Sequence, residues 1–299
     1  MRYHPAYGFL LALFGALVLT PDTLLMRMSE MDGYQMLAWR GMLMGGVMLF
    51  AWAVTSKNKS SDVALLISLA GFLVVFCHFL NAALFNLAIA AAPVSIVLFA
   101  VATVPIFAAI FSQVLFGEPT SLATWVAIVA VLAGISIAVF GNEAGRIGIE
   151  LNTALGALAG LSVAAAMAIY LVIIRHRPHL PILLVMGVGS LLAGLTGLAV
   201  TGPGELTEGN VWPIVLTGTV ILPVSFGCLA IASRYTHASN VSLLILLETV
   251  FGPLWVWWGV GEVPTPAMLV GGAVVVGSIA VYLWTTGGRQ NRGYIPIQD

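Results

Sequence analysis

The chain has 299 residues, of which 60% are hydrophobic and only 8% are Asp, Glu, Lys or Arg. A water-soluble domain carries about 25% charged residues, so most of this surface cannot face water and the chain is predicted to be an integral membrane protein. The net charge is -1 and no cluster of Lys and Arg forms a basic patch. These two features argue against nucleic acid as a partner.

Ten stretches of the chain have the length and composition of membrane-crossing helices, which require about 20 largely apolar residues. In chain order they are 6–26, 34–54, 63–87, 93–115, 121–140, 152–174, 180–200, 212–233, 240–260 and 264–285. The loops between them are too short for an additional soluble domain. The first stretch has features of a signal peptide, but its cleavage would leave one half of the chain a span short, so we expect it to be retained.

The distribution of Lys and Arg predicts that both termini are cytoplasmic. Eight of the 11 basic residues then fall on the cytoplasmic side, Arg27 and Arg146 fall in outer loops, and Arg40 lies within a span. Ten spans satisfy this alternation, whereas nine or eleven would break it. The predicted fold class is therefore an all-α integral membrane protein with ten transmembrane helices, placed in the cytoplasmic (inner) membrane as a multi-pass protein.

Residues 93–140 and 240–283 repeat one pattern: an apolar run containing a proline, a Gly-Glu pair, and a second apolar run. Each half has five spans, and because five is odd the second half must enter the membrane inverted. The predicted domains are a first repeat (1–141), an outer linker (142–150), a second repeat (151–286) and a cytoplasmic tail (287–299). Such inverted repeats place a substrate site between the halves, near the midplane of the bilayer.

With these features the chain resembles the drug/metabolite transporter superfamily, and within it the EamA-type permeases. The resemblance is carried by Trp39-Arg40-Gly41 in the second span and by the proline and Gly-Glu pattern of both repeats, which ends in Gly117-Glu118 and Gly261-Glu262. The chain departs from the family at 20–23, where Thr-Pro-Asp-Thr replaces the usual Trp-Gly.

The resemblance implies a secondary transporter that works by alternating access, with export of amino acids or related compounds as the leading expectation. S-adenosylmethionine or nucleotide-like compounds are the alternatives. It also implies that spans 1–4 and 6–9 surround the substrate, while spans 5 and 10 form an outer scaffold.

Few charged side chains remain inside the predicted spans, where each costs at least about 2.5–3.5 kcal/mol at a helix centre. Glu248, near the middle of the ninth span, is the leading candidate for proton coupling or for binding a substrate amine; a structural ion pair with Arg40 is the alternative. Arg40 would suit a carboxylate or phosphate, or a permanent partner. Asp22 is a third candidate because the adjacent Pro21 loosens the helix. Asp22 and Arg40 lie at similar depths, so their pairing is the most economical neutralisation.

Four further residues are candidates for lining the cavity. His78 and Asn81 are three residues apart and share one face of the third span, whereas simple spacing places Asn86 off that face. His78 would supply a titratable group, or only a satisfied hydrogen bond. Trp39 and Tyr170 would suit an apolar or aromatic substrate, or would belong to an interfacial belt.

The sequence contains neither HExxH nor GxSxG, and no GxxxxGK[ST] loop, which argues against an intramembrane enzyme and an ATP-driven pump. We expect no catalytic residues, cofactor or metal. The glutamates of the two Gly-Glu pairs are predicted to complement the N-termini of the helices that follow them. The expected partners are a small-molecule substrate, the lipid bilayer and a coupled proton; the sequence leaves monomer and homodimer open.

Overall fold

The computed structural model describes residues 5–117, 122–140, 151–235 and 238–290, and regular secondary structure in these ranges is helical throughout. In chain order the elements are α1 (Pro5–Leu19), α2 (Asp22–Met28), α3 (Gly33–Thr55), α4 (Lys59–Ile67), α5 (Leu69–Ala91), α6 (Val94–Val101), α7 (Val104–Phe116), α8 (Leu122–Phe140), α9 (Leu151–His176), α10 (Ile182–Thr201), α11 (Val211–Leu216), the π-helical turn η1 (Thr217–Ile221), α12 (Leu222–Tyr235), α13 (Ala238–Val260) and α14 (Pro266–Gln290).

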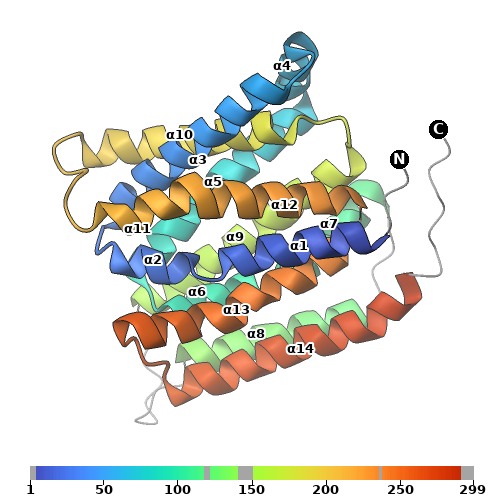
Figure 1. Cartoon of the computed structure of the whole chain (residues 1–299). Coiled ribbons are helices and arrows are strands. Elements are labelled where there is room, and N and C mark those ends of the chain that lie inside the picture. The colour runs from blue at the N-terminus through green and yellow to red at the C-terminus, as the bar shows by residue number, and fades with distance from the viewer. Residues whose placement is uncertain (1–4, 118–121, 141–150, 236–237, 291–299) are drawn as a thin grey trace.

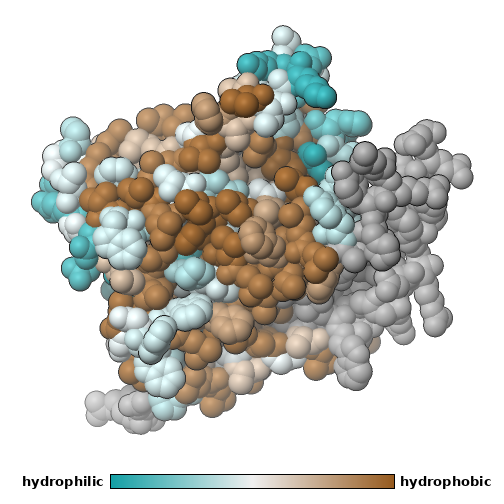
Figure 2. Space-filling model, viewed as in Figure 1, coloured by the Kyte–Doolittle hydropathy of each residue, from teal (hydrophilic) through white to brown (hydrophobic). Residues whose placement is uncertain are grey.

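Seven helical stretches of the described chain are long and apolar enough to cross a membrane: Tyr7–Met28, Gly33–Thr55, Leu69–Ala91, Val94–Phe116, Leu151–His176, Ile182–Thr201 and Val211–Tyr235. Three shorter apolar helices accompany them, at Trp125–Ala138, Leu244–Val260 and Pro266–Ser278. Each of the ten predicted spans overlaps one of these helices. Figure 2 shows a hydrophobic surface across the middle of the bundle, with hydrophilic residues gathered toward its two ends. The chain is a multi-pass membrane protein.

The helices of the two halves interleave in one bundle (Figure 1). When a helix of the first half packs on a helix of the second, the corresponding helices of the two halves also pack on each other. Helix α5 packs on α9 as α12 packs on α1, and α6 packs on α9 as α13 packs on α1 and α2. Three sets of corresponding helices are in direct contact: α3 with α10, α8 with α14, and α6 and α7 with α13. The α8–α14 pair lies along one edge of the bundle, and the first turn of α1 lies at the same end as the last turn of α14. This exchange pattern is the arrangement expected of two structurally related repeats.

Glycines allow the corresponding helices to approach at backbone distance. A Cβ built on Gly41 of α3 would lie 2.4 Å from the backbone nitrogen of Gly194 in α10. A Cβ on Gly134 of α8 would lie 2.8 Å from the carbonyl oxygen of Gly271 in α14. Both distances are too short for any side chain, so these contacts depend on glycine, as is common between membrane helices.

The structure interrupts four of the predicted spans: the first, the third, the fourth (between α6 and α7) and the eighth (at the π-helical turn η1). The third span does not begin at residue 63: Ser68, with its ψ of 155°, ends the short helix α4 and begins α5, and its Oγ accepts a hydrogen bond from the Gly71 nitrogen at 3.1 Å. Helix α4 contains no buried residue. The first span breaks at Thr20 and Pro21 into α1 and α2, where proline cannot donate the backbone hydrogen bond that would continue the helix. The break in the first span places Asp22 at the start of a new helix.

Candidate substrate cavity

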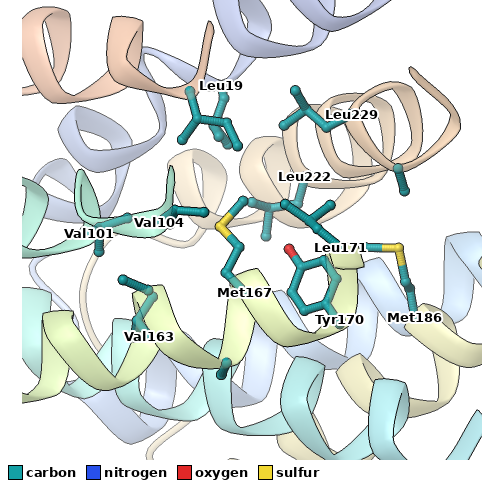
Figure 3. Close-up of a cluster of buried hydrophobic side chains, with 14 of the residues drawn as sticks. Leu19, Val101, Val104, Val163, Met167, Tyr170, Leu171, Met186, Leu222 and Leu229 are labelled. Carbon is teal, nitrogen blue, oxygen red and sulfur yellow. The ribbon is translucent and has the colours of Figure 1, made fainter. Parts of the chain in front are cut away.

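A cavity lies in the interior between the two halves of the chain. Its polar lining consists of Asp22, Arg40, His78, Asn81 and Asn86 from the first half and Ser190 and Glu248 from the second. Its apolar lining consists of Leu19, Met44, Phe85 and Val101 from the first half and Val163, Met167, Leu222 and Phe226 from the second. In Figure 3, Val163 and Met167 project from α9 toward Val101 and Leu222, with Leu19 on the opposite side. Both halves are therefore needed to form the cavity.

The cavity is narrow. Its lining encloses about 600 Å³ of empty space, but only about 50 Å³ of this can hold the centre of a water-sized molecule. A single water needs about 10–15 Å³ by the same measure. The volume of about 50 Å³ is the space that a ligand or water can occupy, because the volume of about 600 Å³ also includes narrow gaps between side chains. In this conformation the cavity holds a few waters or a small ligand group.

Asp22 and Arg40 form the ion pair predicted from the sequence. Asp22 Oδ2 lies 2.5 Å from Arg40 Nη2, and the two side chains are only 1% and 4% exposed. The other Arg40 nitrogen, Nη1, donates to Asn86 Oδ1 at 3.3 Å and also contacts the Met26 sulfur. The guanidinium carbon lies 5.9 Å from the centre of the Phe85 ring, a cation–π contact. Both terminal nitrogens of Arg40 are thus occupied by the protein itself.

Glu248 faces the same cavity but is not paired. It lies midway along α13 and is 6% exposed. Among the described residues, no hydrogen bond or ion pair engages its carboxylate, although Asp22 and Arg40 lie within electrostatic range. The alternative of a direct Glu248–Arg40 ion pair is therefore not what the structure contains. The corresponding position of the first repeat, Val101, lines the same cavity.

The third polar group of the cavity is centred on His78. Its Nε2 lies 2.9 Å from Ser190 Oγ of α10, so this nitrogen is satisfied as the alternative interpretation expected. Its other nitrogen, Nδ1, is buried and has no hydrogen-bond partner in the described chain. Asn81 lies one helical turn away and also lines the cavity.

The prediction that Asn86 lies off the cavity face of α5 was wrong. Residues 78, 81, 82, 85 and 86 all line the cavity, so this face of α5 is wider than the spacing of two residues suggested. The physical reason is the helical period of 3.6 residues, which places Asn86 only about 80° round α5 from His78. Arg40 of α3 contacts its amide oxygen there.

Trp39 and Tyr170, the two aromatic candidates, are not among the residues that line the cavity. The Trp39 indole nitrogen donates to the Leu206 carbonyl oxygen at 2.7 Å and so holds the loop that follows α10. Tyr170 is fully buried behind His78, with the two rings edge to face at 5.5 Å between centroids. Figure 3 shows its hydroxyl pointing among Met167, Leu171 and Leu222. Tyr170 supports the His78 ring rather than facing the cavity.

The cavity residues that sequence reasoning missed are Ser190 and the apolar side chains opposite it. Ser190 is the buried polar residue of the glycine-rich helix α10, and a census of uncharged polar residues within spans would have included it. No local signal distinguishes Phe85, Met167 or Phe226 from other apolar residues, because only the packing of distant helices brings them together.

Glu262 joins the two halves at one end of the bundle. Its Oε1 accepts from the Val94 backbone nitrogen at 2.9 Å, and its Oε2 lies 3.1 Å from Arg27 Nε. Arg27 also donates to the Ala92 carbonyl oxygen at 2.7 Å. We call this set of contacts the Arg27–Glu262 bridge.

The prediction for Glu262 was partly wrong. The carboxylate does complement a helix N-terminus, but that of α6 in the other half rather than that of the following helix. The cause is Gly261, whose φ of 76° turns the chain after α13, a conformation that glycine adopts readily. Gly117, its counterpart in the first repeat, has a φ of 73°. Glu118 lies outside the described residues.

Two interleaved helical repeats in a membrane, with a polar cavity between them that draws on both, define the class of small-molecule membrane transporters. The EamA-like transporter family matches this chain twice, over residues 6–140 and 154–284, and the chain belongs to that family. This assignment points to a transporter rather than an enzyme.

Two comparisons with individual proteins agree with the family. The chain is 26% identical over 263 residues to an uncharacterized transporter, YdfC, of Bacillus subtilis (strain 168), and the match covers 84% of this chain and 83% of that protein. A solved crystal structure superposes on 96% of this chain and 99% of its own, with a TM-score of 0.65 at 18% sequence identity. The second likeness concerns the fold alone.

Proposed function

We propose that this protein is a secondary transporter that moves small metabolites, amino acids or compounds related to them, out of the cell by alternating access. The observation that carries the proposal is Glu248, whose carboxylate has no partner among the described residues and faces a cavity that both repeats line. Buried ionisable groups in membrane proteins are costly and are characteristic of ion and substrate pathways. Export is the direction that the family resemblance favours.

The proposed topology has ten spans in two inverted sets of five, with both termini in the cytoplasm. The charge distribution supports this orientation, because eight of the 11 Lys and Arg then lie on the cytoplasmic side. The exchanged helix contacts between the halves, and the shared end of α1 and α14 in Figure 1, fit the same arrangement.

Glu248 is the proposed coupling residue. Asp22 and Arg40 neutralise each other at 2.5 Å, so Glu248 is left as the acidic group that can take a proton or a substrate cation. A proton and a substrate cation cannot occupy the Glu248 carboxylate at the same time. This competition couples export of a substrate to uptake of a proton at a single residue.

Alternating access requires the cavity to widen toward each side in turn. About 50 Å³ of usable room is too little for a metabolite of amino-acid size, so the halves must separate for one to enter. The Arg27–Glu262 bridge joins α2 and α6 to the end of α13. In the proposed topology this is the outer end, and the bridge must break when the cavity opens there.

The test is counterflow in liposomes that contain the purified protein, with a panel of amino acids and related amines, with and without a pH gradient. A carrier gives saturable exchange that the pH gradient alters. Glu248→Gln should exchange substrate only at higher substrate concentration than the wild type, and its exchange should no longer respond to the gradient. Glu208→Gln, an exposed loop glutamate, is the matched control and should behave as the wild type. An unchanged pH response in Glu248→Gln would rule out the coupling role, and flux that never saturates would indicate a channel.

A further inference from the structure

We infer that the cavity recognises the ammonium group of a small amphipathic amine that carries no free carboxylate. This inference rests on the proposed transport function and narrows its substrate class. It distinguishes amines from the α-amino acids, whose carboxylate and ammonium groups would both need partners in the cavity.

The first argument is that the cavity offers no pair of free cationic donors that could bind a carboxylate through both of its oxygens. Arg40 Nε and His78 Nδ1 are buried without a hydrogen-bond partner in the described chain, and each could donate a single hydrogen bond. Arg40 is the guanidinium in the lining, and its terminal nitrogens are engaged by Asp22 at 2.5 Å, by Asn86 at 3.3 Å and by the Met26 sulfur. A substrate carboxylate could pair with the terminal nitrogens of Arg40 only by displacing Asp22, which would leave the Asp22 carboxylate buried without its counter-charge. His78, the remaining basic side chain of the lining, is held by Ser190 through Nε2 alone.

The second argument is that hydrogen-bond acceptors are free. The Glu248 carboxylate has no partner in the described chain. Asp22 uses Oδ2 for Arg40, whereas its Oδ1 is buried and has no hydrogen-bond partner there. With Asp22 and Glu248 ionised, Arg40 charged and His78 neutral, the lining carries one net negative charge. A monovalent cation with N–H donors is the ligand that neutralises this charge.

The third argument is the apolar wall. Val101, Met167, Leu222 and Phe226 lie in the same lining as Glu248. An apolar substituent would cover them, and the flexible Met167 side chain can adapt to its shape. Phosphate-bearing ligands fit poorly, because they would need several free cationic donors.

The experiment measures binding to the full chain in detergent by isothermal titration calorimetry. The probes form a matched set on one carbon skeleton: leucine, its amide, its decarboxylated amine (isopentylamine) and its deaminated acid (4-methylpentanoate). We expect leucinamide and isopentylamine to bind at least about tenfold more tightly than leucine, and the acid not to bind. Leucine or the acid binding as tightly as the amines would overturn the inference, and so would failure of both amines to bind.

Glu248→Gln should weaken amine binding about 10- to 100-fold, the loss typical of a charge-assisted hydrogen bond. Glu248→Asp, which keeps the charge, should recover part of the affinity, and Glu208→Gln should leave it unchanged. Elution from size-exclusion chromatography and thermal unfolding verify that each variant is folded. Unaltered amine affinity in folded Glu248→Gln would also overturn the inference. Saturable exchange of leucine but not of the amines would reject this substrate class and leave the transporter proposal intact, whereas non-saturating flux of every probe would reject the transporter itself.

Discussion

Two ion pairs among the described residues, Asp22–Arg40 and Arg27–Glu262, differ in burial, in length and in what they connect. Asp22 and Arg40 lie 2.5 Å apart within the first repeat, with side chains 1% and 4% exposed. Arg27 and Glu262 lie 3.1 Å apart across the two repeats, with side chains 24% and 30% exposed. Removing one member of a buried pair strands the other charge and costs about 3–5 kcal/mol. A partly exposed pair such as Arg27–Glu262 is screened by solvent and contributes about 1 kcal/mol.

This difference separates a permanent contact from a switchable one. A pair as costly to break as Asp22–Arg40 must persist through every conformation of the protein, so it fixes the charge of the cavity. A contact as weak as the Arg27–Glu262 ion pair can open and close in each transport cycle. The four predictions that follow test this contrast, in order of decreasing effect.

Asp22→Asn should have the largest effect on stability. It leaves the Arg40 guanidinium buried without a counter-charge, so we expect a loss of about 3–5 kcal/mol in the free energy of unfolding. Thermal unfolding of the detergent-solubilised protein measures the change. The double variant Asp22→Asn/Arg40→Gln removes both charges and should recover much of the loss. A wild-type unfolding temperature for the single variant would show that the pair is not structural.

Glu248→Gln should abolish coupling without loss of stability. This carboxylate has no ion-pair partner in the part of the chain that the structure describes, and an amide is cheaper to bury than a charge. We expect an unfolding temperature at or above that of the wild type, together with loss of the pH response in counterflow. Destabilisation as large as that of Asp22→Asn would show that Glu248 has a structural partner in the membrane.

Amine affinity should rise with pH. A protonated Glu248 cannot pair with an ammonium ion, so Glu248 must lose its proton before an amine binds. Loss of one proton on binding raises the affinity by at most about tenfold per pH unit. The charged and titratable groups around it are Asp22, Arg40 and His78. Protonation of His78 at low pH would add positive charge and act in the same direction. Titration calorimetry at a series of pH values measures this slope, and a His78→Asn variant separates the two contributions.

Glu262→Gln should have the smallest effect on stability, about 1 kcal/mol or less. Glutamine keeps an oxygen that can accept from the Val94 nitrogen, so only the charge interaction with Arg27 is lost. Easier opening at this end should alter the exchange rate more than the affinity for substrate. The charge-swapped variant Arg27→Glu/Glu262→Arg is the control. If Glu262→Gln lowered the free energy of unfolding by several kcal/mol, the Arg27–Glu262 ion pair would be a permanent contact like Asp22–Arg40.

Much of the architecture could be predicted from the sequence because the bilayer constrains it strongly. Hydropathy located the helices, and matching depths on consecutive spans predicted the Asp22–Arg40 pair. The start of α5 was missed because a serine cap interrupts an otherwise apolar run. The partner of Glu262 and the place of Asn86 could not be predicted, since both depend on contacts between residues far apart in the chain. Trp39 gave no local sign that its indole would hold the loop after α10.

Glu248 and Val101 occupy corresponding positions of the two repeats, and both line one cavity. In a dimer of identical single-repeat chains, any mutation at this position would appear twice in the same cavity. A new carboxylate would therefore always lie close to a second carboxylate of the same charge. Joining two repeats in one gene removes this constraint. Selection can then change the charge of the site one unit at a time, with one repeat keeping an apolar wall while the other acquires a reactive group.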